Sequence, residues 1–256
     1  MLNNKLSLAK TLFFSIAILL AAAQASARTW PQKTYDRDPA RNYDHVFGVY
    51  RPLTNYNDAD FAEGAAMASP LYNPIYASYD VIVVVNRTNI SAAGKIVERA
   101  QRARVYVRAE ALARLNQANM QNLTYDEASG LLLYLKTTTG SPGHGTPPGH
   151  YRVLGFSSDH KSAKYGNAPM PNAVWFNEVG IYTHGVDPKL FGILGTSPAS
   201  HGCVRLETQR AGDLFHLVGH IGQGSVDALD RSGNPITDAK GNVRKIEAYK
   251  TLYIIR

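Results

Sequence analysis

The chain contains a single cysteine, Cys203, and the residue types around it are those that nucleophilic catalysis requires. A thiol becomes a strong nucleophile when an imidazole or a helix N-terminus stabilises its thiolate. His184 follows a short β-like stretch, and Cys203 comes a few residues before an amphipathic helical pattern. A compact domain could bring the ring and the sulfur together. We therefore expect Cys203 to be the nucleophile and His184 its acid/base partner.

The glycines beside this pair suit acyl transfer. Gly202 leaves room for an incoming carbonyl, and the backbone N–H groups of Gly202 and Cys203 are candidate donors to a developing oxyanion. No Asp or Glu stands where it could orient His184, so we expect a backbone carbonyl, that of Gly185, to do so.

Two other interpretations of these residues remain open. His184, His201 and Cys203 could bind zinc, but the two-residue separation on a Gly-containing turn is an unusual ligand spacing. His201 could itself be the base, although a residue two positions from the nucleophile usually points elsewhere. The remaining histidines are expected to be surface or structural groups, with His144 and His150 as possible exceptions in a Gly/Pro-rich loop: His45, His144, His150, His160, His216 and His220.

The N-terminus has the pattern of a secretory signal at residues 1–27. Lys5 and Lys10 precede an apolar run, and Ala25–Ala27 provides small residues for cleavage. Retention of the segment as an anchor is the alternative. No later run reaches the roughly 18–20 apolar residues of a membrane helix, so we expect no transmembrane segment after cleavage and a location in the periplasm or cell envelope. A lone cysteine in an exported chain forms no internal disulfide.

The charge balance favours an anionic partner. The whole chain has a formal net charge of +7, and removal of the two signal lysines leaves +5. Nucleic acid, a membrane surface and an acidic wall polymer all fit that sign. Export and the lack of Lys/Arg runs interleaved with aromatics exclude nucleic acid.

The hydrophobic patterns predict many short strands and few helices, which is typical of a mainly β domain. The expected strands are 81–85, 104–108, 131–135, 151–156, 173–176 and 251–255, and the expected helices are 109–119 and 208–218. A loop is expected at 140–149, a polar stretch between the fourth and fifth strands as a candidate lid, and hairpin turns at 230–234 and 238–242. Residues 28–79 hold seven of the fifteen tyrosines and form an irregular arm with one short helix near 58–67.

The motif around the cysteine resembles the signature of the L,D-transpeptidase (YkuD-like) catalytic domain. The residues that carry the resemblance are His184-Gly185, then Ser200-His201-Gly202-Cys203-Val204-Arg205-Leu206, and a second block of Thr138-Thr139-Gly140 and Thr146-Pro147-Pro148-Gly149-His150-Tyr151. The likeness covers roughly residues 80–226. The segments 109–130 and 227–250 depart from it.

The resemblance implies a mainly β, sandwich or barrel-like domain over residues 80–256, with one or two short helices, a C-terminal hairpin extension and no cofactor. It also implies Cys203 as nucleophile, His184 as proton-transfer partner and Gly185 as the carbonyl that orients it. The remaining motif residues would form the frame of the site: Ser200, His201, Gly202 and Arg205.

The activity implied by the resemblance is acyl transfer on peptidoglycan stem peptides. Cys203 would release the terminal D-alanine and form a thioester, which an amine of a second stem or of a wall-attached protein would resolve. Water as acceptor would make the protein a carboxypeptidase instead. A non-catalytic wall-binding scaffold is the alternative from a different class.

Overall fold

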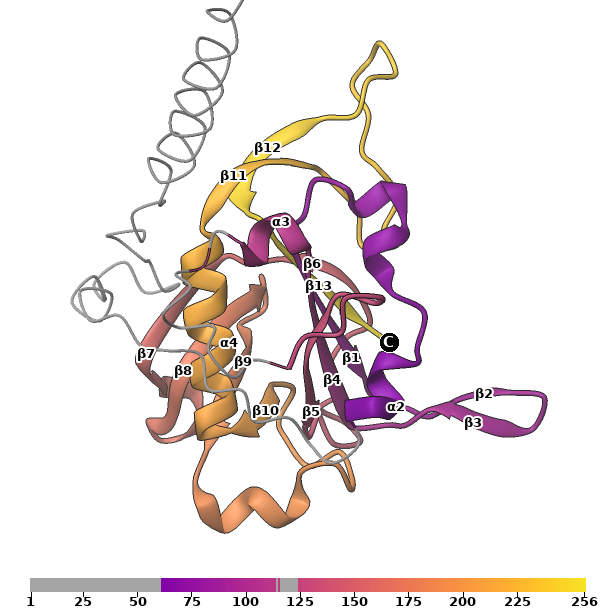
Figure 1. Ribbon diagram of the computed structural model, residues 1–256. Coiled ribbons are helices and arrows are strands. Elements are labelled where there is room, and N and C mark those ends of the chain that lie inside the picture. Colours follow the sequence, from indigo (N-terminus) through magenta and orange to yellow (C-terminus); the bar gives the residue numbers. More distant parts are fainter. Residues whose placement is uncertain (1–60, 114, 116–123) are drawn as a thin grey trace, which may run out of the picture.

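The computed structural model describes residues 61–113, 115 and 124–256 (Figure 1). Two β-sheets form its frame. The five-stranded sheet has the order β5–β4–β1–β13–β6, with β1 at Val81–Asn86, β4 at Arg102–Val107, β5 at Leu131–Lys136, β6 at Gly149–Arg152 and β13 at Thr251–Ile255. The four-stranded sheet has the order β10–β9–β8–β7, with β7 at Gly155–Ser162, β8 at Ala168–Asn177, β9 at Ile181–Val186 and β10 at Val204–Glu207. The pairs β1–β13 and β9–β10 are parallel.

Smaller elements surround this frame. Two hairpins stand apart from the main sheets: β2 (Ile90–Ala92) with β3 (Lys95–Glu98), and β11 (Gln223–Asp227) with β12 (Lys245–Tyr249). The α-helices are α2 (Phe61–Ala65), α3 (Ala109–Leu112) and α4 (Thr208–Ile221), and the 3-10 helices are η2 (Pro70–Tyr72), η3 (Pro74–Tyr76), η5 (Ala163–Tyr165) and η6 (Pro188–Ile193). No helix in this part of the chain combines the length and apolar composition that crossing a bilayer requires.

The two faces of the five-stranded sheet belong to different hydrophobic clusters. The β-branched run of β1 is buried along its whole length, as expected of a central strand. One cluster joins this sheet to the four-stranded sheet and α4, and it includes Val83, Val105, Val174, Leu206 and Phe215. A second cluster joins its other face to the segment before β1, and it includes Ile82, Tyr106, Leu252, Leu71 and Tyr79. The domain is therefore mainly β, with few short helices, as the sequence predicts.

The polar stretch expected to form a lid is largely strand. β7 continues to Ser162 and β8 begins at Ala168, and the two pair from Gly155 opposite Trp175 to Ser162 opposite Ala168. The expectation of one strand over 151–156 is also wrong, because β6 and β7 divide there and join different sheets. The hairpin turns are confirmed: Asp230 Oδ1 accepts hydrogen bonds from the backbones of Ser232 and Asn234.

The structure covers only the end of the Tyr-rich arm. Residues 1–60, with the expected signal and most of the arm, lie outside the described residues. In the part that is described, Tyr79 is buried and its hydroxyl donates to the carbonyl of Asp227 at 2.7 Å. The Tyr76 hydroxyl lies 2.8 Å from His150 Nε2. Residues 61–79 thus pack against the domain.

Candidate active site

The register of β9 and β10 places His184 and Cys203 on the same face of the four-stranded sheet. Thr183 lies opposite Val204, and His184 opposite Arg205. Val204 belongs to the core between the sheets, so its neighbours Cys203 and Arg205 project from the outer face, together with His184. Cys203 is then a diagonal neighbour of His184 across the parallel pair β9–β10.

A small hydrophobic cluster surrounds Cys203 on this outer face. Its buried members are Met170, Ala173 and Tyr182, and Cys203 packs against it. The Tyr182 ring stacks on His160 with 4.6 Å between ring centroids. The thiol therefore lies on an aromatic and aliphatic surface built by β8 and β9.

His184 is held in one tautomer by its own strand. Its side chain is buried, and its Nδ1 lies 2.8 Å from the carbonyl oxygen of Gly185. Because a carbonyl only accepts, Nδ1 carries the proton and Nε2 presents a lone pair. Burial lowers the pKa of His184 to about 4; the Gly185 carbonyl opposes this, and the charge of Arg205 adds to it. At neutral pH the ring is an uncharged base.

The thiol is also uncharged at rest. Burial raises the pKa of Cys203, against a hydrogen bond from the Tyr182 backbone and the charge of Arg205, which both lower it. The expected help from a helix N-terminus is absent, because β10 separates Cys203 from the first residue of α4, Thr208. The dipole of a helix acts only within about one turn. Activation of the sulfur thus depends on removal of its proton.

The turn that presents Cys203 is fixed by Ser200. Ser200 Oγ donates to the carbonyl of Cys203 at 2.5 Å and accepts from the N–H of Gly202 at 3.0 Å. Gly202 has φ +116°, a conformation that favours glycine. The Gly202 N–H is bonded to Ser200 in this conformation, so its role as an oxyanion donor stays a prediction that requires this bond to open. The Cys203 N–H remains the other candidate.

Arg205 and the second motif block hold this turn against the five-stranded sheet. Thr138 N donates to the carbonyl of Arg205 at 3.2 Å, and the N–H of Arg205 donates to the carbonyl of Thr138 at 2.9 Å. The guanidinium of Arg205 donates to the carbonyl of Ala199 at 3.2 Å. Arg205 therefore holds the segment before Cys203 in place, and its positive charge lowers the pKa of both His184 and Cys203.

The Gly/Pro-rich loop, residues 140–149, packs against the turn that presents Cys203. Buried Thr146 donates from Oγ1 to the carbonyl of Gly202 at 2.6 Å and accepts from the N–H of Gly140 at 2.9 Å. His201 is exposed, with ring centroids 4.9 Å from His144 and 4.6 Å from Tyr165 of η5. His201 thus belongs to a row of rings beside the turn. His150 contacts Tyr76 instead.

The sequence patterns missed three side chains of this site. Tyr182, His160 and Thr146 are given no role in the site by the sequence, although the period-two alternation of β9 places Tyr182 beside His184. Thr146 was visible in the second motif block, but its bond to Gly202 joins distant segments. His160 is expected from the sequence to be a surface or structural group, whereas in the structure it stacks on Tyr182 and its charge, when present, lowers the pKa of His184.

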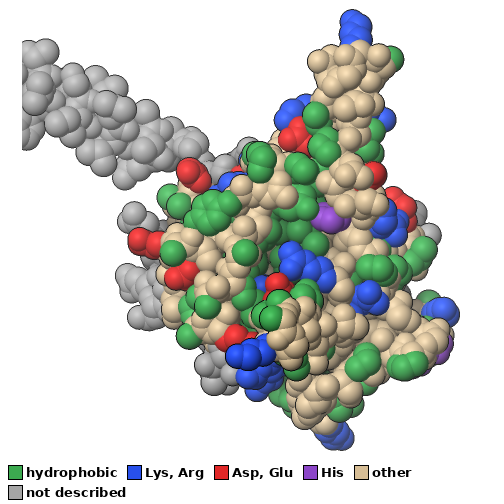
Figure 2. All heavy atoms as spheres, turned by 90° about the vertical axis from the view of Figure 1, so that its right-hand side faces the viewer, with side chains coloured by type: hydrophobic (Ala, Val, Ile, Leu, Met, Phe, Trp, Pro, Cys, Tyr) green, Lys and Arg blue, Asp and Glu red, His purple; other side chains and the backbone are tan. Residues whose placement is uncertain are grey.

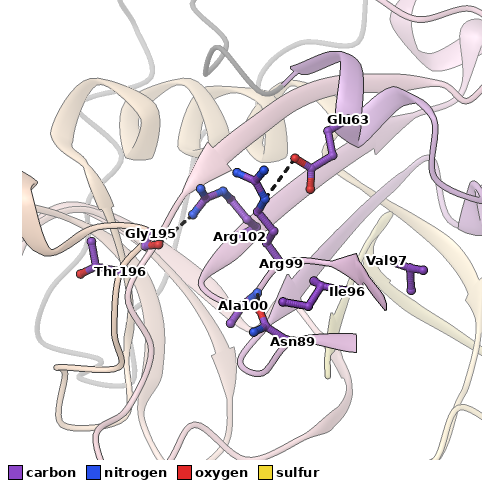
Figure 3. Close-up of a pocket in the computed structure, with 9 residues that line it drawn as sticks. All are labelled: Glu63, Asn89, Ile96, Val97, Arg99, Ala100, Arg102, Gly195 and Thr196. Atoms are coloured by element: carbon purple, nitrogen blue, oxygen red, sulfur yellow. Dashed lines mark hydrogen bonds and ion pairs between the residues drawn. The ribbon is translucent and has the colours of Figure 1, made fainter. Parts of the chain in front are cut away.

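The cavity in Figure 3 is lined by neither His184 nor Cys203. It measures about 560 Å³ and lies between the β2–β3 hairpin, Glu63 of α2 and the loop at Gly195 and Thr196. Arg102 donates to the Gly195 carbonyl at 3.1 Å, and Arg99 pairs with Glu63 at 3.3 Å. Within the described residues, no group of three or more potential metal ligands is found.

Comparison with known families fits this geometry. The model of the L,D-transpeptidase catalytic domain (YkuD) matches residues 110–236, which include all the residues of the site. The chain carries an L,D-transpeptidase catalytic domain. No curated protein gave a significant match.

Solved structures similar to the chain are also L,D-transpeptidases. One from Mycobacterium smegmatis has 16% identity, covers 70% of this chain and 59% of its own, and gives a TM-score of 0.42. One from Mycobacterium tuberculosis has 16% identity, with coverages of 70% and 58% and a TM-score of 0.41. One from Stackebrandtia nassauensis has 20% identity, with coverages of 54% and 50% and a TM-score of 0.36. The chain thus spans about three-fifths of the length of the first two.

Proposed function

We propose that the mature protein is an exported L,D-transpeptidase that acts on peptidoglycan stem peptides through a thioester on Cys203. The observation that carries the proposal is the arrangement of His184 and Cys203 on one sheet face, with Nδ1 of His184 occupied by the Gly185 carbonyl. With Nδ1 occupied, the lone pair of Nε2 is the one that can accept the thiol proton. The matched catalytic domain supports the substrate class.

The first half of the reaction forms the thioester. Nε2 of His184 takes the thiol proton as Cys203 Sγ attacks the carbonyl that joins the third stem residue to terminal D-alanine. The C–N bond breaks, the imidazolium returns its proton to the departing amine, and D-alanine leaves. Because both groups are neutral at rest, we expect proton transfer to accompany attack rather than to precede it.

The second half transfers the acyl group to an amine. His184 accepts a proton from the attacking amine, the new amide C–N bond forms as the thioester C–S bond breaks, and the imidazolium returns the proton to the departing Cys203 thiolate. An amine of a second stem gives a 3→3 crosslink, and a lysine of a wall-attached protein gives protein attachment. Water in the same position gives a carboxypeptidase.

Defined tetrapeptide muropeptides test the proposal. Mature protein, residues 28–256, is incubated with them, and the products are identified by mass. We expect D-alanine release and crosslinked dimers, loss of both in Cys203→Ala, and a fall of about 10² or more in rate in His184→Ala. His201→Ala tests the alternative base and should lower the rate less than His184→Ala does.

Each contrary result has a distinct meaning. Turnover in Cys203→Ala would refute the thioester. A normal rate in His184→Ala with a large loss in His201→Ala would move the base to His201. Release of D-alanine without dimers or protein adducts, at saturating amine, would assign hydrolysis.

A further inference from the structure

A second cavity, lined with arginines, lies at the edge strand β6. It measures about 410 Å³, and neither Cys203 nor His184 lines it. Arg152 of β6 and Arg231 and Arg244 of the β11–β12 loop (residues 228–244) contribute the charge, over apolar side chains that include Phe176 and Leu252. Figure 2 shows the β11–β12 loop projecting at the top with a basic side chain at its tip, and basic side chains around a hollow below it.

The positive charge of this cavity is poorly neutralised. Glu178 is its only acidic lining residue; its carboxylate lies 4.0 Å from Arg231 and its side chain is 72% exposed. Exposed pairs at this distance contribute little. In the portion of the chain that the structure describes, Arg152 and Arg244 form no ion pair with a carboxylate. Two guanidiniums are thus free to bind an anion.

One of the three arginines, Arg231, is held in place by its neighbours. The Arg231 guanidinium lies 4.4 Å from the centroid of the Tyr151 ring and donates to the Tyr151 hydroxyl at 3.1 Å. The Arg231 side chain packs over Gly149, where an added Cβ would lie 2.5 Å from Arg231 Cδ. The backbone of Arg244 donates to the Ile236 carbonyl at 2.8 Å, which fixes the position from which its exposed side chain extends. The fixed Arg231 side chain lowers the entropic cost of binding beside it.

The cavity lies where the matched catalytic domain meets segments outside the match. Arg152 and Arg231 fall within the matched residues 110–236, whereas Arg244 lies after them and Tyr79 before them. The cavity of Figure 3 differs, because its two arginines already have Glu63 and the Gly195 carbonyl as partners. An aromatic and aliphatic floor beneath free guanidiniums suits an anionic group attached to an apolar or sugar backbone.

We propose that this cavity is a second wall-binding site, which holds a carboxylate of the peptidoglycan polymer away from Cys203. The identification of the ligand as a wall carboxylate rests on the proposed function. The charge and shape of the cavity are observed independently of that function. Arg152 and Arg244 bind the carboxylate, and Arg231 forms the wall beside Tyr151. The site keeps the enzyme on the polymer between acyl transfers.

Binding, not turnover, tests this site. Cys203→Ala protein, which cannot acylate, is cosedimented with purified peptidoglycan at low salt. We expect Arg152→Gln with Arg244→Gln to weaken binding about tenfold or more. Lys240→Gln removes one charge from the β11–β12 loop outside the cavity and should change binding less than twofold. Thermal unfolding checks that all variants fold.

Peptidoglycan with its carboxylates amidated provides the second arm. On this polymer the arginine substitutions should have no effect, because their partner is gone. Equal binding by the arginine variant and its parent on native polymer would overturn the proposal. So would an equal loss in Lys240→Gln, or persistence of the arginine effect on amidated polymer. Phosphate that abolishes the difference where acetate does not would assign the cavity to a phosphate instead. D-alanine release by wild-type protein separately reports on the proposed function.

Discussion

Gly185 occupies the most constrained position beside the candidate base, and Gly185→Ala is the sharpest perturbation that the structure offers. Its carbonyl orients His184, and its Cα faces the first residue of α4. An added Cβ would lie 2.8 Å from Thr208 Cα and 2.9 Å from Thr208 Oγ1. The nearest atom is backbone, so no side-chain rotation relieves the contact. Either β9 or the start of α4 must move.

The cost follows from that geometry. Ordinary van der Waals contact begins near 3.4 Å, so the methyl group would be about 0.6 Å too close. Overpacking of this kind costs about 1–3 kcal/mol. At about 2–4 °C per kcal/mol for a domain of this size, Tm should fall by about 2–12 °C. A shift of β9 also moves the ring of His184, and misplacement of a catalytic group by about 1 Å lowers rates by up to about 10²-fold.

The assay combines thermal unfolding with the rate of D-alanine release. Gly192→Ala is the matched control, because an added Cβ there meets no atom within 4 Å and the backbone needs no positive φ. We expect Gly192→Ala to keep the wild-type Tm and kcat, and Gly185→Ala to have a lower Tm and a lower kcat. A Gly185→Ala protein with wild-type Tm and kcat would refute the close packing of β9 against α4 and the dependence of His184 on it.

Three further predictions concern pH, a covalent probe and a buried hydroxyl. Burial lowers the pKa of both His184 and His220 to about 4, so between about pH 6.5 and 4 the unfolded chain binds more protons than the folded chain. The free energy of unfolding should therefore fall as the pH drops through that window. His184→Gln should make this fall shallower in a plot of Tm against pH. The match to the L,D-transpeptidase catalytic domain leads us to expect that a carbapenem adds its mass to wild-type protein but not to Cys203→Ala in intact-protein mass spectrometry. Absence of an adduct on a thiol that still reacts with iodoacetamide would contradict this. Thr146→Val leaves the buried Gly202 carbonyl and the half-buried Gly140 N–H without their partner and should cost about 2–4 kcal/mol in denaturant unfolding, whereas Thr196→Val at an exposed site should cost little.

The sequence alone was sufficient wherever the decisive contacts are local. The β-branched run at 81–85 predicts a buried strand, and β1 occupies it. Apolar spacing predicts a helix from Thr208, and α4 begins there. The twin Asp turns also close through hydrogen bonds within five residues. Cys203 as sole thiol and its motif followed from the chain itself, and their catalytic roles stay predictions.

Only the tertiary structure decided the environment of the candidate site. A helix close in sequence suggested a stabilised thiolate, yet β10 intervenes and burial raises the pKa of Cys203. The sequence offers the Gly202 N–H as a free donor, but in the structure it donates to Ser200 Oγ. The arginine cavity joins Arg152 to Arg244, which no local pattern links. Sequence periodicity reports which face of a strand is apolar, whereas burial, register and hydrogen-bond partners depend on segments far apart in the chain.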